Sequence, residues 1–198
     1  MRVVGITGSI GTGKTTVAGV FRRMGYEVID LDECAKRLLE GRAIGREIAQ
    51  ALGQPEDHLD RKRLADVVFS DEEKLAALEA ILHPRVIAAL EGRLEQLKGY
   101  SKDIVFVDGP LIFEKGLHKR LDLVLVVSAE DRLVEERLRA RGMDEEDVRR
   151  RRRAQMPLKE KEKLADFVIY NNGTVSDLEA QAVKCLQEIR RKLDGTPE

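Results

Sequence analysis

The segment that most constrains this chain is residues 8–15, which read GSIGTGKT and match the phosphate-binding loop G-x-x-x-x-G-K-T at every fixed position. The apolar run Val3 to Thr7 before it predicts a buried strand, and Thr15 to Met24 after it predicts a helix with one apolar face. The glycines let the backbone turn so that its N–H groups point inward at a helix N-terminus, where an anion binds. The alternative, a glycine-rich turn with a chance lysine, is disfavoured by the length and context of the motif.

The motif assigns chemistry to particular residues. Lys14 supplies a positive charge for the β- and γ-phosphates of a nucleotide, and we expect its side chain to be an exposed one that contributes little packing. Thr15 offers a hydroxyl to Mg²⁺. The predicted ATP-binding residues of this loop are Gly11, Thr12, Gly13, Lys14, Thr15 and Thr16.

Composition restricts the class of protein. The chain has 198 residues, 42% of them apolar, and its 35 Lys and Arg nearly balance its 36 Asp and Glu. A real core is therefore possible, and no global field attracts nucleic acid or a membrane, so we expect neither as a partner. Cys34 and Cys185 lack metal-ligand spacing, which predicts free thiols in a reducing compartment. With no signal peptide and no apolar stretch of about 20 residues, a cytoplasmic location is expected.

Four further apolar runs predict buried parallel strands, and helical patterns separate them. The runs are Tyr26 to Ile29, Ile104 to Val107, Leu121 to Val127, and Phe167 to Tyr170. Together with the first strand they predict an α/β fold with a five-stranded parallel sheet. Capping boxes are expected at three helix starts: Ser70 with Glu73, Ser128 with Asp131, and Ser176 with Glu179.

About 70 residues between the second and third strands show no strand pattern. Helices are predicted there, with breaks near Gly41, near 53–55 and at His83-Pro84: Cys34 to Leu39, Ile44 to Leu52, Arg61 to Phe69, Glu72 to Leu82, and Val86 to Leu97. An ordinary crossover needs only a dozen or so residues, so the excess predicts an inserted helical lobe over the carboxyl edge of the sheet. The predicted core is residues 1–31 and 101–198, and the predicted lobe is 32–100.

Asp32 is the first candidate catalytic residue because it follows the second strand, at the sheet edge where ligands bind. A carboxylate there can take a proton from an acceptor hydroxyl during phosphoryl transfer. The alternative is a helix N-cap, a role open to either Asp30 or Asp32.

Asp108 ends the third strand, and an apolar run followed by Asp is typical of a residue that holds Mg²⁺ or its waters. A turn at Asp108-Gly109 is the alternative. Beyond it, the segment Pro110 to Glu114 either lines a pocket or packs the loop.

Arginines are concentrated after the fourth strand. Arg137 and Arg141 lie one helical turn apart and can reach one point, and Arg149 to Arg153 form an unbroken run. This pattern favours a lid, at about residues 132–160, that stabilises charge on a transferring phosphoryl group. The alternative is a solvated basic face or a weak nucleic-acid patch.

Two further sites remain open between structural and binding roles. His83 is either structural or binds a phosphate or ribose. Asn171, Asn172 and Gly173 form a turn whose backbone can meet a base, and Asn172 and Gly173 are the predicted ATP-binding residues there. No Asn-Lys-x-Asp or Asp-x-x-Gly follows the strands, so a GTPase switch is disfavoured and a small-molecule kinase is indicated.

The chain resembles the dephospho-CoA kinase family along nearly its whole length. The specific segments are Leu82-His83-Pro84, the run Pro110 to Glu114, Gln155, and the run Ala165 to Gly173. The chain departs from the family pattern at Glu40-Gly41-Arg42, where a Pro-Gly break is usual, and at Ile112, where Leu is usual.

The resemblance implies that the γ-phosphate of ATP is transferred, with Mg²⁺, to the ribose 3′-hydroxyl of dephospho-CoA. It implies a sheet order of 2-3-1-4-5, Asp32 as general base, and Arg137 and Arg141 as lid arginines. It places Arg61, His83 and Glu114 at positions that bind the acceptor. The alternatives are a kinase of the same fold acting on a nucleoside monophosphate or sugar acid, and a non-enzymatic regulatory P-loop protein.

Overall fold

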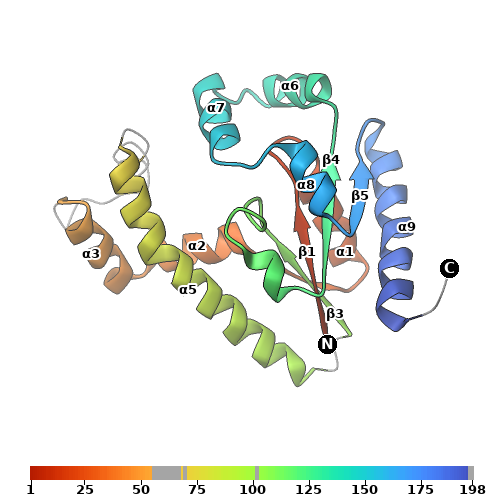
Figure 1. Cartoon of the computed structure of the whole chain (residues 1–198), viewed down its shortest axis with the longest axis horizontal. Helices are drawn as coiled ribbons and strands as arrows, with labels where there is room; N and C mark the ends of the chain where they lie inside the picture. The colour runs from red at the N-terminus through yellow and green to blue at the C-terminus, as the bar shows by residue number, and fades with distance from the viewer. Residues whose placement is uncertain (55–67, 69–70, 101–102, 196–198) are drawn as a thin grey trace. The chain divides into compact units, whose positions relative to one another are not determined.

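A computed structural model describes residues 1–54, 68, 71–100 and 103–195 of the chain. At its centre is a five-stranded sheet in the order β2-β3-β1-β4-β5 (Figure 1). The strands are β1 (Arg2–Thr7), β2 (Glu27–Asp30), β3 (Ile104–Asp108), β4 (Leu123–Ser128) and β5 (Phe167–Tyr170). Strand β1 pairs in parallel with β3 and β4, and β4 with β5. The five predicted strands and their order are confirmed, although β4 begins two residues later than predicted.

The sheet is buried on both faces, which explains why its strands read as unbroken apolar runs. Every residue of β3 and β4 is buried. On one face pack α1 (Lys14–Arg23) and α9 (Val175–Asp194), and Phe21 of α1 stacks on Phe106 of β3 with ring centroids 4.3 Å apart. On the other face, a Cβ added at Gly5 would lie 3.0 Å from Ile112 Cδ1, so the segment after β3 packs closely there.

Three short helices lie between β4 and β5. They are α6 (Asp131–Ala140), α7 (Glu145–Arg153) and α8 (Leu158–Leu164). Buried Val134 and Leu138 of α6 form a small cluster with Ile10 of the P-loop, residues 8–15. The first helix of the predicted lid therefore packs directly on the loop that binds phosphate in such motifs.

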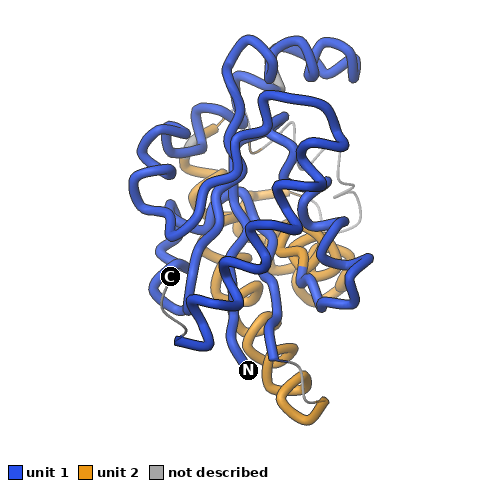
Figure 2. The backbone as a smooth tube through the Cα atoms, turned by 90° about the vertical axis from the view of Figure 1, so that its right-hand side faces the viewer, with its two compact units in different colours: residues 1–29, 101–198 blue, residues 30–100 orange. Residues whose placement is uncertain are grey.

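The chain divides into two compact units, coloured separately in Figure 2. Residues 1–29 and 101–198 form the α/β unit, and residues 30–100 form the helical unit. The described helices of the helical unit are α2 (Leu31–Glu40), α3 (Arg42–Ala51) and α5 (Glu72–Lys98). The helix predicted at Arg61 to Phe69 lies outside the described residues, apart from Val68.

The helix break predicted at His83-Pro84 is wrong, because α5 continues through both residues. A proline inside a helix removes one backbone donor and disturbs the carbonyls of the preceding turn. The N–H that Pro84 lacks would have donated to the Ala80 carbonyl. At the next carbonyl, that of Ile81, the Arg85 guanidinium adds a contact, since its Nη1 donates there at 2.6 Å. Its Nη2 also pairs with Glu47 of α3 at 2.6 Å. These two contacts hold Arg85, directly after Pro84, to its own helix and to α3.

The predicted capping residues also need correction. The N-cap of α5 is Asp71, whose side chain accepts from the N–H groups of Glu73 and Lys74. The capping box of α9 joins Thr174 and Asp177, two residues before the predicted pair. A capping side chain must stand immediately before the first helical residue, so a small error in the helix start selects the wrong residue. Ser128 is part of β4 and caps no helix; its hydroxyl bonds to Glu162.

Both cysteines are free thiols, as predicted. Cys185 is buried in α9, and this burial raises its thiol pKa to about 12. Among the described helices, none combines the length and the apolar character needed to cross a membrane.

Candidate active site

The P-loop joins the end of β1 to the start of α1. Gly11 and Gly13 have φ angles of 83° and 103°, a region that residues with a side chain rarely occupy. A Cβ on Gly13 would also lie only 2.3 Å from Asn171 Nδ2. Gly13 is the N-cap of α1, and no side chain caps this helix end. No side chain therefore competes with a ligand for the N–H groups at the start of α1, where the Thr16 N–H donates to the Gly13 carbonyl at 2.9 Å.

Lys14 and Asp108 form an ion pair in this structure. Asp108 is the last residue of β3 and is only 2% exposed, and Gly109 continues the ladder by donating to the Ile6 carbonyl at 3.1 Å. The expectation that Lys14 is exposed is wrong, because its side chain is 16% exposed and lies against this carboxylate. Two oppositely charged groups thus meet beside the uncapped end of α1.

Oxygen donors for a divalent cation are present near the P-loop. Asp108 supplies a buried carboxylate, and Thr15 lies exposed in the first turn of α1. Carboxylate and hydroxyl oxygens are the donors that Mg²⁺ prefers. Among the described residues, no three His, Cys, Asp or Glu side chains cluster as a complete metal site. This set suits a metal that keeps waters and phosphate oxygens among its ligands.

A cavity of about 640 Å³ adjoins the P-loop within the α/β unit. Its walls come from the P-loop, the ends of β4 and β5, and the helices after β4. They include Ser9, Ile10, Thr12, Ser128, Glu130, Arg152, Gln155, Lys159, Glu162, Tyr170 and Asn172. The predicted ATP residues Thr12 and Asn172 thus line one cavity.

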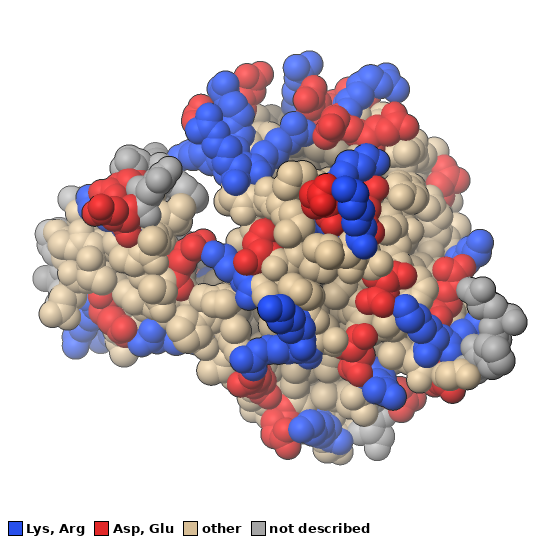
Figure 3. Space-filling model, in the orientation of Figure 1, with Lys and Arg blue, Asp and Glu red and all other residues tan. Residues whose placement is uncertain are grey.

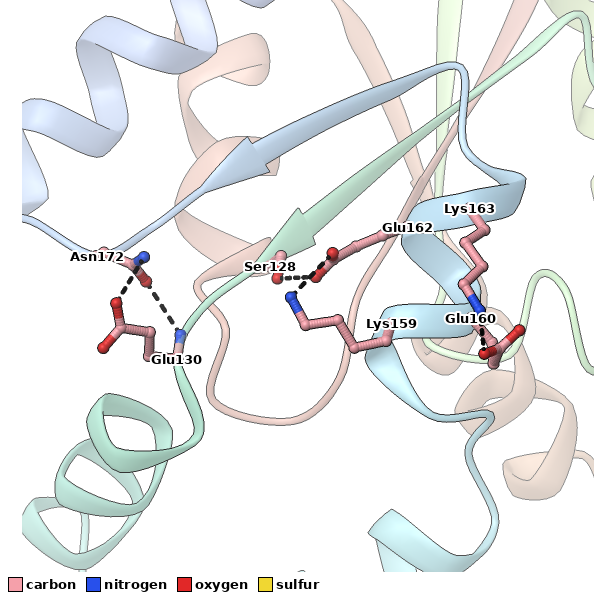
Figure 4. Close-up of polar contacts among 7 residues, drawn as sticks. All are labelled: Ser128, Glu130, Lys159, Glu160, Glu162, Lys163 and Asn172. Atoms are coloured by element: carbon pink, nitrogen blue, oxygen red, sulfur yellow. Dashed lines mark hydrogen bonds and ion pairs between the residues drawn. The ribbon is translucent and has the colours of Figure 1, made fainter.

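Figure 4 shows the polar contacts at this wall. The Asn172 carboxamide accepts from the Glu130 backbone N–H at 3.0 Å and donates to the Glu130 carboxylate at 3.3 Å. The Ser128 hydroxyl donates to Glu162 at 2.6 Å, and Lys159 lies 3.3 Å from the same carboxylate. These bonds connect the start of α6 to the end of β5, and α8 to the end of β4.

Arg137 and Arg141 take different positions. Arg137 donates from Nη2 to the Asn171 carbonyl at 3.1 Å and to Asn171 Oδ1 at 3.3 Å. Arg141 is the C-cap residue of α6, and its side chain is exposed. The structure therefore brings Arg137 to the end of β5, and a shared target for both guanidiniums remains a prediction.

The arginine run of α7 is largely solvated. Arg149 pairs with Glu146 at 3.4 Å and Arg152 with Glu135 of α6 at 3.6 Å. Figure 3 shows acidic and basic side chains mixed over α6, and a group of basic side chains over α7 with acidic ones at its edge. This favours the solvated interpretation for most of the run.

Glu114 and Lys161 form a buried ion pair. Glu114 was identified from the sequence, but Lys161 was not. Lys161 is 0% exposed, and its Nζ donates to Glu114 Oε1 at 2.8 Å and to the Pro110 carbonyl at 2.6 Å. Glu114 Oε1 also accepts from the Met156 N–H at 2.7 Å. Burial lowers the pKa of Lys161, and the Glu114 carboxylate partly opposes that shift. The pair ties the segment after β3 to the start of α8.

Lys161 is one of three lysines in α8, and composition does not distinguish it from Lys159 and Lys163. The one usable signal is its helical spacing from Leu158 and Ala165, which places it on the inward face. Asn171 was read only as part of a turn, yet it is 5% exposed and contacts both the P-loop and Arg137.

The remaining predicted residues belong to the helical unit. Asp30 is the N-cap of α2, accepting from the Glu33 N–H at 3.0 Å. Asp32 lies exposed in the first turn of α2, two residues after β2 ends, so the choice of capping residue is settled in favour of Asp30. His83 lies half-buried within α5. Arg61 lies outside the described residues.

The strand order, the P-loop and the charged groups beside it define a P-loop phosphotransferase of the α/β class. The protein-family model for dephospho-CoA kinase matches residues 2–177. A dephospho-CoA kinase of Aquifex aeolicus is 40% identical over 198 residues, covering 96% of this chain and 99% of the relative. One of Thermus thermophilus is 44% identical over 193 residues, with 94% and 91% covered.

A solved dephospho-CoA kinase from Campylobacter jejuni has a TM-score of 0.70 and 29% sequence identity, with 96% of this chain and 98% of that chain covered. The chain belongs to the dephospho-CoA kinase family. Its activity is the ATP-dependent phosphorylation of dephospho-CoA, the final step of coenzyme A biosynthesis. A regulatory protein without enzymatic activity, and a kinase of nucleoside monophosphates, are thereby set aside.

Proposed function

We propose that the α/β unit binds ATP with Mg²⁺ at the P-loop and transfers the γ-phosphate to the ribose 3′-hydroxyl of dephospho-CoA. The observation that carries this proposal is the meeting of Lys14 and Asp108 beside the uncapped N-terminus of α1. Phosphoryl transfer from a nucleoside triphosphate needs a cation, a carboxylate that can bind a metal, and backbone N–H groups, all at one point.

The phosphates lie in the P-loop, against the N–H groups of residues 11–16, in this proposal. Lys14 exchanges Asp108 for the β- and γ-phosphate oxygens when the nucleotide binds. Asp108 and the Thr15 hydroxyl would hold Mg²⁺, which when bound neutralises charge on the phosphates. The nucleotide base extends toward Asn172 and Gly173, and the position of Asn172 on the 640 Å³ cavity supports this placement.

Asp32 acts as the general base in this proposal. Its carboxylate orients the acceptor 3′-hydroxyl and accepts its proton as the oxygen attacks the γ-phosphorus. Support comes from Asp30, which already provides the helix cap and so leaves Asp32 without that structural role.

Arg137 and Arg141 supply positive charge to the phosphoryl group during transfer. The packing of α6 on the P-loop through Ile10 supports this role for Arg137, because the helix that carries it contacts the phosphate loop directly. Arg61, His83 and Glu114 bind the acceptor. Glu114 Oε1 is occupied by Lys161 and the Met156 N–H, so this carboxylate also holds the two segments around the site together.

The test is a turnover assay with a panel of acceptors, measuring ADP release and identifying the product by ³¹P NMR. We expect dephospho-CoA to be preferred over AMP and over a sugar acid, with the new phosphate on the 3′-oxygen. Removal of divalent cations with EDTA should abolish turnover, and added Mg²⁺ should restore it. Faster phosphorylation of AMP, or full turnover in EDTA, would contradict the proposal.

A further inference from the structure

Asn171 connects two parts of the active site that are far apart in the sequence. It follows β5 directly, and its Nδ2 donates to the Thr12 carbonyl of the P-loop at 2.7 Å, in a bond buried from solvent. Its Oδ1 and its backbone carbonyl both accept from Arg137 Nη2, at 3.3 and 3.1 Å. One side chain therefore contacts the phosphate loop and the lid arginine at the same time.

The bond to Thr12 bears on the orientation of the P-loop backbone. In a trans peptide the carbonyl and the N–H point in opposite directions, and the described chain contains no cis peptide. Anchoring the Thr12 oxygen on Asn171 therefore directs the Gly13 N–H away from Asn171. Gly13 is the N-cap of α1, so this N–H belongs to the group that faces an anion at the helix end.

Arg137 is only partly satisfied by these contacts. Its Nη2 is held by Asn171, but its Nη1 is buried and has no hydrogen-bond partner among the described residues. A buried charged donor without a partner is costly, so an arrangement that keeps it in place points to an anion that arrives later. Asn171 holds the guanidinium by one nitrogen and leaves the other for that anion.

We propose that Asn171 is a positioning residue that couples the P-loop to Arg137 for phosphoryl transfer. The inference rests on the role of Arg137 in the proposed function. A carboxamide suits the task because it offers a donor at one end and an acceptor at the other. An aspartate keeps the acceptor for Arg137 but loses the donor, and sets a carboxylate oxygen against the Thr12 carbonyl. A serine is too short to reach both partners.

The first test compares Asn171→Asp with Gln181→Glu. Gln181 donates from its carboxamide to the Tyr170 carbonyl at 3.2 Å in an exposed hydrogen bond, so the control makes the same amide-to-acid change beside the residue that precedes Asn171. We expect Asn171→Asp to lower kcat by roughly 10- to 100-fold with KM for dephospho-CoA changed less than about twofold. The control should keep kcat within about twofold. Equal kcat values in a folded Asn171→Asp variant and the control would overturn the proposal.

The second test asks whether Asn171 acts through Arg137. Arg137→Ala, Asn171→Ser and the double variant form a cycle, with kcat measured for each. If the two residues act as a unit, the double variant should be no more than about threefold slower than Arg137→Ala. Losses that multiply would show that Asn171 does not work through Arg137, and the coupling would be withdrawn.

A third measurement needs no Asn171 variant and so covers the case in which substitution prevents folding. Side-chain amide hydrogens of Asn171 should exchange with solvent at least about tenfold more slowly than those of Asn172, and Arg137→Ala should speed them. If the Asn171 amide hydrogens exchange at the same rate in the wild type and in Arg137→Ala, the coupling of Asn171 to Arg137 is overturned. If wild-type protein fails to phosphorylate dephospho-CoA, the proposed function fails, whereas an active wild type with independent residues contradicts only this inference.

Discussion

The α/β unit and the helical unit differ in how deeply they are packed. In the α/β unit, β3 and β4 are buried at every residue, and one cluster joins the sheet to α1 and α9. Among the described residues of the helical unit, α2 has none that is fully buried, and the buried apolar side chains are Ile48, Ala49, Leu52, Val68, Leu90 and Leu97. Free energies of local opening follow the number of buried apolar contacts. We therefore expect the helical unit to open more readily than the sheet.

This difference fits the different roles proposed for the two units. The groups proposed to act on the phosphates include Lys14 and Asp108, which pair where α1 begins and where the buried strand β3 ends. The residues proposed to contact the acceptor lie mostly in the unit with the thinner core. Charged groups that stabilise a transferring phosphate need a rigid support. Helices that can move allow a large acceptor to enter and bind.

The largest expected effect comes from removing the P-loop cation. Lys14→Ala should lower kcat by at least about 10³-fold, because the charge at the transferring phosphate is lost. It should also reduce the melting temperature, since buried Asp108 loses its ion-pair partner. Steady-state kinetics and thermal unfolding measure the two effects. Lys184→Ala, on exposed α9 surface, is the control. Near-normal turnover in Lys14→Ala would remove the P-loop from the mechanism.

The second prediction tests whether the helical unit supplies the base. Asp32→Asn should lower kcat by roughly 10²- to 10⁴-fold with little loss of stability, because the proton acceptor is gone while the cap is kept. Asp30→Ala is the matched variant and should cost about 0.5–2 kcal/mol of stability through the lost cap. Kinetics and denaturant unfolding separate the two. If Asp32→Asn has a lower free energy of unfolding but a normal kcat, Asp32 is a structural residue and its role as general base is contradicted.

The third prediction concerns the lid within the α/β unit. Arg137→Ala should lower kcat by roughly 10- to 10³-fold and weaken ATP binding much less, since its charge is needed most during transfer. Arg151→Ala, from the exposed run of α7, should change kcat less than about twofold. Calorimetric ATP binding together with kcat gives both quantities. Similar losses in the two variants would argue against a special role for Arg137.

The fourth prediction sharpens the assignment of the acceptor to the helical unit. His83→Ala should raise KM for dephospho-CoA by roughly 3- to 10-fold, about the value of one hydrogen bond, and leave KM for ATP nearly unchanged. Dephospho-CoA should slow hydrogen exchange in α5 around His83, whereas ATP alone should mainly protect residues 8–16. Protection of α5 by AMP to the same degree would count against the assignment.

The smallest expected effect is a pH dependence within the α/β unit. Because burial lowers the pKa of Lys161, the folded protein releases this proton at a lower pH than the unfolded chain does. Between the lowered pKa and the ordinary value of 10.5 the unfolded state holds more protons, so stability should rise with pH relative to Lys161→Met. Urea unfolding of both proteins across alkaline pH measures the difference. A free energy of unfolding of the wild type that falls with pH relative to that of Lys161→Met would contradict the predicted sign.

Much of the α/β unit was predictable because its signals are local. Each strand has four to six residues and contains a short apolar run, and the P-loop is one continuous motif. The helical unit was harder to predict. Helix α5 continues through Pro84, and Arg85 pairs with Glu47 of α3, a partner that nothing near Pro84 in the sequence reveals.

The candidate site shows the same division. Lys14, Asp108 and Asp32 were identified because each sits in a motif or directly after a strand. Lys161 and Asn171 were missed because their chemistry depends on burial and on distant partners. In the sequence Lys161 resembles a surface lysine, and only the structure shows that it contacts Pro110 and Glu114.

The sequence by itself determined the P-loop, the order of strands and helices in the α/β unit, and the free state of both cysteines. These features depend on residue type and on spacing over a few neighbours, which a linear chain displays directly. Only the tertiary structure decided that Lys14 pairs with Asp108, 94 residues away, and that Asn171 bonds to Thr12, 159 residues away. The choice of such partners follows from how the sheet brings strand ends together, and local propensity carries no information about it.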